Sequence, residues 1–150
     1  MKSIIAVAIL TATLSAAQAG EATETVRGFY TDVDFEPDPA MRDRFVDPAR
    51  GKFEENDKLS GNGAEVGCID FVLSIDGQDY DEKVLASTLQ LSEEDNGDEA
   101  TVTATFSLFD GQPDSEREIL WSLTNVDGDW KVSDIESRTN DWKLSAFDCN

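Results

Sequence analysis

The chain is 150 residues long and carries 32 acidic against 12 basic side chains, a formal net charge of -20, with no histidine. So acidic a surface disfavours nucleic acid and anionic membranes as partners, because both attract positive charge, whereas a basic protein or a cationic ligand would be drawn to it. Solubility alone is the plainer explanation of the charge, and the length suits one domain with a core of its own.

Residues 1–19 have the pattern of a secretory signal peptide. Lys2 supplies a positive start, an apolar run covers residues 4–14, and Ala17-Gln18-Ala19 is a small-residue cleavage box before Gly20. The apolar run is too short for a membrane-spanning helix, although an N-terminal membrane anchor is the alternative. We therefore expect cleavage after Ala19 and a single domain over residues 20–150 that is periplasmic or secreted, with no membrane span.

Two cysteines, Cys68 and Cys149, follow the signal peptide. In an oxidising compartment such a pair is expected to form a disulfide. A metal or redox role is not expected, because the chain has no histidine and no C-x-x-C motif. The predicted bridge is structural and ties the last residues to the middle of the chain.

Apolar residues recur at helical spacing over residues 21–33. Val26, Phe29, Tyr30 and Val33 follow the i, i+3, i+4, i+7 pattern of an amphipathic helix. We expect this helix to cover one face of whatever sheet the chain forms.

Two Asp-Pro pairs, Asp38-Pro39 and Asp47-Pro48, each place a capping residue before a proline that can open a helix. A short helix is expected after each pair. The side chains expected to face inward are Met41, Phe45, Ala49 and Phe53. Ser60-Gly61-Asn62-Gly63 then predicts a loop.

Beyond that loop the apolar period changes from helical to extended. Residues 68–73 are a short apolar segment that ends at Asp76-Gly77, and residues 85–91 alternate as a strand. Residues 93–99 are an acidic turn. Residues 101–109 alternate cleanly, with apolar side chains on one face and hydroxyls on the other.

Residues 119–135 predict a β-hairpin around Asp127-Gly128. Asp-Gly is favoured in type I′ turns, because both central residues need a positive φ. A two-residue turn sets four pairs: Val126 with Asp129, Asn125 with Trp130, Leu123 with Val132, and Trp121 with Asp134. Helices followed by such a meander predict an α+β fold, with N-terminal helices packed on a curved antiparallel sheet in a cone-shaped, cystatin-like roll. A pocket at the wide end of the cone is the default site.

The segments Trp121-x-Leu123 and Asp127-Gly128-x-Trp130-Lys131-Val132, after an N-terminal helix ending in Phe29-Tyr30, resemble the nuclear-transport-factor-2-like (cystatin-like α+β) superfamily. Within it, Ile69-Asp70-Phe71, Gly77-Gln78-Asp79-Tyr80 and residues 130–135 are similar to a bacterial exported family known as domain of unknown function 3828. Val72-Leu73 departs from the Asp-Pro-Phe usual in that family. The resemblance implies a fold far more than a function, since the superfamily includes isomerases, dehydratases, carriers and dimerisation modules.

Asp134 is the single candidate for catalysis. The regular register places it beside Trp121 on the apolar face, where desolvation would raise the pKa of its carboxyl and suit it to general acid or base work. A β-bulge near Ser133 is the alternative that we favour. It would turn Ile135 inward and Asp134 outward, and Ile135 is the more natural core residue.

The ligand-binding candidates are Tyr30, Asp70, Gln78, Asp79, Tyr80 and Trp121. They would line one cavity if the middle segment crosses the mouth of the cone. In the structural alternative, which we favour, Asp70 and Asp79 cap turns or pair with Arg27 or Arg44. Phe29 and Tyr30 then belong to the core.

No metal site or cofactor is expected. The acidic turn at 93–99 lacks the spaced D-x-[DN]-x-[DN]-G pattern and the closing glutamate of a calcium loop. Gly61-Asn62-Gly63 leads into no phosphate-binding motif, and a nucleophile triad of the usual kind needs a histidine.

Three functional hypotheses follow. The leading one is an exported, non-catalytic domain that binds a small molecule or a protein, for instance an acidic inhibitor or immunity-type protein for a basic cell-wall enzyme. The second is an isomerase- or lyase-type enzyme that uses Asp134. The third is a homodimer or scaffold that pairs through an apolar patch of Leu120, Val126 and Ile135 on the outer sheet face.

Overall fold

The computed structural model describes residues 20–61 and 67–149. The predicted signal peptide and part of the predicted loop at 60–63 lie outside the described residues. The elements, in chain order, are α1 (Glu21–Thr31), η1 (Pro39–Arg44), α2 (Ala49–Gly61), α3 (Glu82–Thr88), β1 (Gln90–Asp95), β2 (Glu99–Ser107), β3 (Glu116–Val126), β4 (Asp129–Ser137), β5 (Trp142–Lys143) and η2 (Leu144–Ala146).

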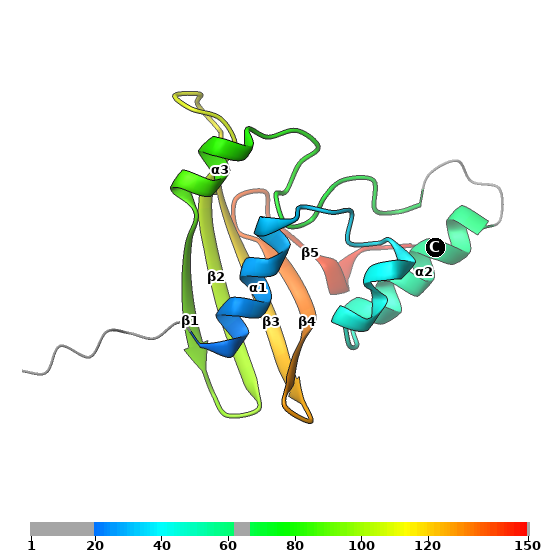
Figure 1. The fold of residues 1–150 in the computed structure, drawn as a ribbon. Helices are drawn as coiled ribbons and strands as arrows, with labels where there is room; N and C mark the ends of the chain where they lie inside the picture. The colour runs from blue at the N-terminus through cyan, green and yellow to red at the C-terminus, as the bar shows by residue number, and fades with distance from the viewer. Residues whose placement is uncertain (1–19, 62–66, 150) are drawn as a thin grey trace, which may run out of the picture.

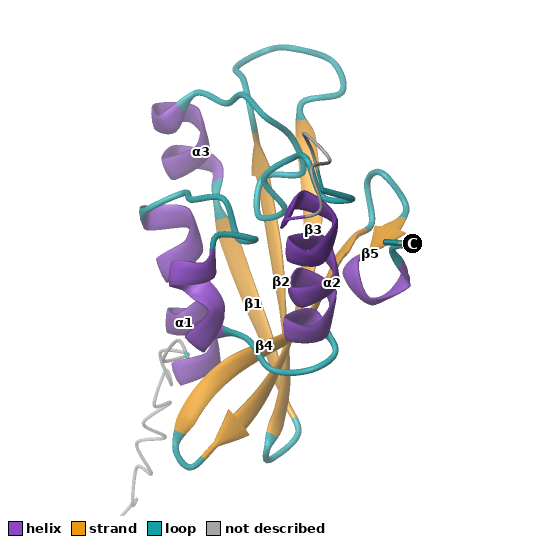
Figure 2. Cartoon of the chain, turned by 90° about the vertical axis from the view of Figure 1, so that its right-hand side faces the viewer, coloured by secondary structure: helices purple, strands orange, loops and turns teal. Residues whose placement is uncertain are grey.

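The fold is α+β, as the sequence predicts. The five strands form one antiparallel sheet in the order β1-β2-β3-β4-β5, so each strand pairs with its neighbour in sequence. Helix α1 lies across one face of the sheet, and α3 stands at the end of β1 and β2 (Figures 1 and 2). We call the face that packs against α1 the inner face and the opposite one the outer face.

The first helix forms over Glu21–Thr31, so the predicted range of 21–33 is two residues too long and Val33 lies beyond the helix end. Val26, Phe29 and Tyr30 are buried against the sheet. The backbone N–H and hydroxyl of Thr23 both donate to Glu93 Oε2, at 2.7 and 2.6 Å. The carboxylate of Glu93 thus binds the positive N-terminal end of α1. The turn predicted at 93–99 is too long, because β1 continues through Asp95.

Both Asp-Pro pairs open helical segments. Asp38 Oδ1 accepts from Ala40 N at 2.8 Å, and Asp47 Oδ1 accepts from Gly51 N at 3.1 Å. The first segment is a 3-10 helix, and the second is a longer α-helix than predicted, since α2 continues through Gly61. The four side chains expected to face inward are buried: Met41, Phe45, Ala49 and Phe53.

The strand predicted over 85–91 is wrong in its first half. Asp81 Oδ1 accepts from Lys83 N and Val84 N, at 2.9 and 3.1 Å, and this N-cap starts α3. Leu85 and Leu89 are four residues apart, so their spacing suits a helix face as well as a strand face. The strand begins only at Gln90.

The hairpin forms as predicted at its turn and changes register higher up. Asp127 and Gly128 have φ values of 55° and 97°, as a type I′ turn requires. The pairs predicted nearest the turn are present, but a bulge at Ser133 places Ile135 opposite Trp121. The predicted pairing of Trp121 with Asp134 is wrong, and the bulge alternative is confirmed.

The bulge also removes the apolar patch that the dimer hypothesis requires. Ile135 is fully buried on the inner face, because a one-residue shift sends each following side chain to the other side of the sheet. Of the three patch residues, only Val126 is exposed, at 41%.

Aromatic rings connect α1 to the sheet and to the segment between η1 and α2. Trp121 Nε1 donates to Tyr30 Oη at 3.0 Å inside the core. The ring of Phe29 lies 4.7 Å from that of Trp121 and 5.7 Å from that of Phe45. Trp130 is only partly buried and packs at the edge of this core.

Cys68 and Cys149 form the predicted disulfide, which closes a sequence separation of 81 residues. Beside it, the rings of Phe71, Trp142 and Phe147 form a second aromatic cluster. Within the described residues, no helix has the length and apolarity that crossing a bilayer would need.

Removing the disulfide should destabilise the domain. A Cys68→Ala/Cys149→Ala variant is expected to lose about 2–5 kcal/mol of unfolding free energy in urea denaturation, because a long loop is freed in the unfolded chain. Wild type treated with a reductant should match the variant. A loss under about 1 kcal/mol would show that the bridge constrains little.

Candidate functional site: a groove between α1 and α3

A groove of about 920 Å³ opens between the C-terminal end of α1 and the side of α3. One wall comes from α1 and the residues after it, and the other from Tyr80 and α3. Its lining residues are Arg27, Tyr30, Thr31, Asp32, Val33, Asp34, Tyr80, Glu82, Leu85, Ala86 and Leu89. Two of the predicted ligand-binding candidates, Tyr30 and Tyr80, thus lie in one groove.

The base of the groove is apolar, because Leu85 of α3 and Leu89, the residue after the helix, pack against the core. Leu85 is buried, while Leu89 and Val33 are partly buried against the core. The N-cap at Asp81 fixes where α3 begins, which places Glu82 at the rim. An aliphatic chain entering the groove would therefore meet carbon below and carboxylates above.

The rim is acidic. Asp32, Asp34 and Glu82 make no ion pair with any described residue, and Arg27 pairs instead with Glu24 at 3.3 Å. The free carbonyls in the last turn of α1 carry partial negative charge, and no basic side chain in that turn balances it. The carboxylates and the helix end thus add to one negative potential.

Arg44 is the cation that partly offsets this potential. Its guanidinium stacks on the Phe29 ring at 3.5 Å and forms no ion pair with the rim carboxylates. Burial lowers the pKa of Arg44, and the charges of Glu36, Asp34 and Asp32 oppose that shift. Because Arg44 is held on the Phe29 ring, the carboxylates of Asp32, Asp34 and Glu82 remain available to pair with a cationic group of a ligand.

Both tyrosines are neutral phenols. Burial raises the pKa of Tyr80, and the nearby charges of Glu82 and Asp34 raise it further. Burial likewise raises the pKa of Tyr30, whose hydroxyl already accepts from Trp121. The groove therefore combines aromatic, aliphatic and anionic groups, a set suited to a cation on an apolar stem.

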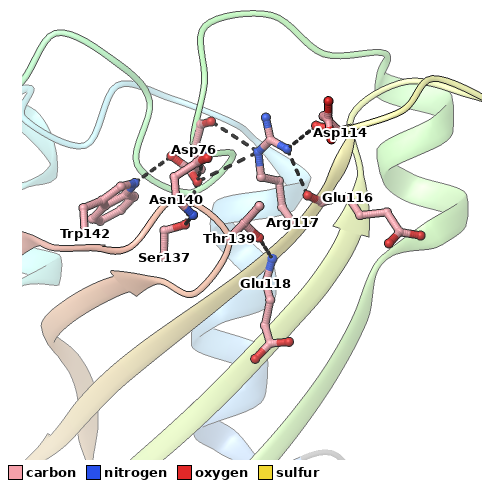
Figure 3. Close-up of polar contacts among 9 residues, drawn as sticks. All are labelled: Asp76, Asp114, Glu116, Arg117, Glu118, Ser137, Thr139, Asn140 and Trp142. Carbon is pink, nitrogen blue, oxygen red and sulfur yellow. Dashed lines mark hydrogen bonds and ion pairs between the residues drawn. The ribbon is translucent and has the colours of Figure 1, made fainter.

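Asp76 holds the loop that leads to Tyr80 (Figure 3). Its side chain is only 5% exposed, and it accepts from Ser137 Oγ at 2.6 Å, Asn140 Nδ2 at 2.6 Å and Trp142 Nε1 at 2.7 Å. Val72 and Gly77 exchange backbone hydrogen bonds across the turn, in which Asp76 has a positive φ of 51°. From the sequence, Asp76 is expected only to end an apolar segment, and nothing local in the sequence indicates the contacts it makes.

Arg117 joins this loop to the turn before β3 (Figure 3). Its Nη1 donates to the backbone carbonyls of Asp114, at 2.7 Å, and Glu116, at 2.9 Å. Its Nε lies 3.9 Å from Asp76 Oδ2 and donates to the Asp76 carbonyl. Arg117 thus neutralises the buried carboxylate and braces the segment that supplies Tyr80.

The other predicted ligand-binding candidates lie outside the groove. Asp70, Gln78 and Asp79 are exposed on the 68–81 segment, where Gln78 Nε2 donates to the Asp70 carbonyl at 3.3 Å. Asp81, rather than Asp79, caps a helix. Trp121 is fully buried in the core.

Asp134 is buried away from the groove, opposite Ser122. Its Oδ1 accepts from Ile135 N at 3.0 Å and Ser145 N at 3.1 Å, and its Oδ2 lies 3.5 Å from Lys143 Nζ. These contacts attach η2 to β4. Asp134 does not line the groove.

Glu36 is a buried carboxylate that no motif in the sequence indicates. It is fully buried, and its two oxygens accept from Leu73 N at 2.9 Å and Ser74 N at 2.8 Å. Burial raises its pKa, although the hydrogen bonds from Ser74 and from the backbone oppose that shift. Within the described residues, no group of three or more histidine, cysteine, aspartate or glutamate side chains could hold a metal ion.

Comparison with known proteins relates the chain to others by fold. No protein-family model and no curated protein matches the sequence. One chain of the crystal structure of the type VI native effector–immunity complex Tae3–Tai3 from Ralstonia pickettii is similar, with a TM-score of 0.53 and 21% identity over 81% of this chain and 97% of that chain. The selenomethionine form of that complex gives a TM-score of 0.49 and 20% identity, over 79% and 97%. At 21% identity, the likeness to the first of these structures shows a shared fold and nothing more.

Replacing the Asp76 carboxylate should destabilise the domain. Asp76→Asn is expected to lose about 2–4 kcal/mol of unfolding free energy, because an amide N–H₂ would face groups that donate and Arg117 would lose its counter-charge. Urea denaturation measures the loss. Asp79→Asn, in the same loop but exposed, is the matched control and should stay within about 0.5 kcal/mol of wild type. Equal effects would show that the network contributes nothing.

Glu36 should make stability depend on pH. A carboxyl whose folded pKa is raised stabilises the protein at low pH, and that contribution is lost as the pH rises through the folded pKa. The unfolding free energy of wild type minus that of Glu36→Gln should therefore fall as the pH is raised above about 4.5, the ordinary pKa. The subtraction removes the effect of the other carboxylates. A difference that is constant or rises with pH contradicts the assignment.

Proposed function

We propose that the chain is an exported, non-catalytic domain that binds a basic protein, as an inhibitor or immunity-type protein would. The charge favours such a partner, and the disulfide fits an oxidising, extracytoplasmic location such as the periplasm. The same proposal includes export by the predicted signal peptide. It also includes membership of the exported family that the sequence resembles.

The groove between α1 and α3 is the observation that carries this proposal. A lysine or arginine side chain could lay its stem along Leu85, Leu89 and Val33 and place its charged head among Asp32, Asp34 and Glu82. The planar guanidinium of an arginine could also stack on the ring of Tyr80, whereas the ammonium of a lysine stacks less well.

The fold comparison supports binding to another protein. The similar chain was crystallised in a complex described as effector–immunity, so this fold occurs in at least one protein–protein complex. In its specific version, the proposal names the partner as a cell-wall enzyme that is a basic protein.

The enzyme hypothesis gains less support from the geometry. Asp134 is occupied by two backbone N–H groups and faces a lysine, away from the groove. A homodimer has to overcome the repulsion between two chains of net charge -20.

The test begins with capture of a partner on the immobilised protein, from a periplasmic extract at low ionic strength. The proposal predicts that the partner is a basic protein whose binding weakens as salt is raised. Its affinity for purified Asp32→Asn/Asp34→Asn should be about tenfold lower than for wild type. Asp127→Asn/Asp129→Asn removes the same charge at the β3–β4 turn and should bind within about twofold of wild type.

Two results would contradict the proposal. One is an acidic or neutral partner whose binding does not depend on salt. The other is no partner at all under the same conditions, with the purified protein shown to be folded.

A further inference from the structure

A second hollow, of about 640 Å³, lies on the other side of α3 from the groove. Its strand residues include Thr105 and Ser107 of β2, which pair with Glu118 and Glu116 of β3. These four side chains are on the outer face, since their neighbours Phe106 and Ile119 point into the core. Residues 87, 88 and 90 close the hollow from the α3 side.

Helix α3 therefore forms a ridge between two hollows. Leu85 and Ala86 face the groove, while Ser87 and Thr88 face the second hollow. The exposed residues along the ridge include Ala86 and Ser87, whose small side chains let another surface approach the helix closely. A body docked on the ridge would reach both hollows.

The second hollow is acidic as well. Glu116 and Glu118 are exposed, and neither makes an ion pair with a described residue. Arg117 also lines the hollow, but it is engaged with Asp76 and with backbone carbonyls. Lys83, an exposed cation on α3, lines neither hollow.

The walls of the second hollow are held in place by hydrogen bonds. Thr88 Oγ1 donates to the Val84 carbonyl at 2.7 Å and accepts from Ser107 N at 2.9 Å, which attaches α3 to β2. Glu118 N donates to Thr139 Oγ1 at 2.9 Å (Figure 3). A surface that is already ordered loses little conformational freedom on binding.

We propose that the α3 ridge and the hollows on its two sides form one docking surface, which a single basic protein straddles with cationic side chains in both hollows. The proposal rests on the proposed function for the identity of the partner. The carboxylates that carry it are Asp32, Asp34 and Glu82 on one side of α3, and Glu116 and Glu118 on the other. A second copy of this acidic chain would be repelled from the same surface.

The test uses a lysine decapeptide as the probe, with calorimetry at about 0.15 M salt, where the Debye length of about 8 Å screens remote charge. Wild type should bind one peptide per protein. Asp32→Asn/Asp34→Asn and Glu116→Gln/Glu118→Gln should each weaken binding by about two- to tenfold, and the combined variant by more than either. Asp127→Asn/Asp129→Asn should stay within about twofold of wild type, because these residues are at the β3–β4 turn. That turn lies at the other end of the sheet from α3 (Figure 1).

The proposal fails if Glu116→Gln/Glu118→Gln binds like the Asp127/Asp129 control. It also fails if two peptides bind per protein, since the hollows would then be separate sites. The side chains of Glu116 and Glu118 form no hydrogen bond or ion pair with a described residue, so these variants should fold, and circular dichroism checks this.

The test separates the docking surface from the proposed function. Peptide binding as predicted, with no basic protein captured, would leave the surface standing and remove the function. A captured basic partner that binds Glu116→Gln/Glu118→Gln and the Asp127/Asp129 control equally would retain the function and remove the straddling geometry.

Discussion

The hydrogen bond between Trp121 Nε1 and Tyr30 Oη is the constraint on which the rest of the structure depends. Both side chains are large and buried, and each carries a polar group that would be costly to leave without a partner. Satisfying both groups at once fixes the C-terminal end of α1 over β3. The bulge at Ser133 serves the same contact, because it places Ile135 rather than a carboxylate opposite Trp121. The first wall of the groove, from Tyr30 to Asp34, follows from this attachment.

The second wall of the groove, formed by Tyr80 and α3, depends on the disulfide and on polar contacts that lie far from the first wall. The disulfide and the Asp76 network hold the 68–77 loop against β3, β4 and β5, and Asp81 then starts α3 where the loop ends. Buried carboxylates do the same work in two places: Asp76 is balanced by Arg117, and Glu36 accepts two backbone N–H groups from the 68–77 loop. Five other carboxylates make no ion pair with a described residue and set the potential on both sides of α3: Asp32, Asp34 and Glu82 on one side, and Glu116 and Glu118 on the other.

The sequence predicted the parts of the fold whose signals are local. Neighbouring residues or a single pair carry the signals for the helix predicted at 21–33, of which 21–31 forms, and for the Asp-Pro starts, the β2 alternation, the Asp-Gly turn and the disulfide. The sequence does not predict α3, because Leu85 and Leu89 suit a helix and a strand equally, although Asp81 is a residue type that caps helices. Of the groove, Tyr30 and Tyr80 were predicted, whereas Asp32, Asp34 and Glu82 were not. Their role appears only when α1 and α3 come together, and no periodicity in the sequence reports that contact.

The surface around α3 should bind positive charge, and an NMR titration of the isotope-labelled protein with a lysine decapeptide measures this residue by residue. The largest changes in backbone amide shift are expected at residues 30–34, 80–90, 105–107 and 116–118, with small changes at 127–129. Changes centred on α2 or on the β3–β4 turn, or spread evenly over all exposed acidic residues, would contradict the proposed surface.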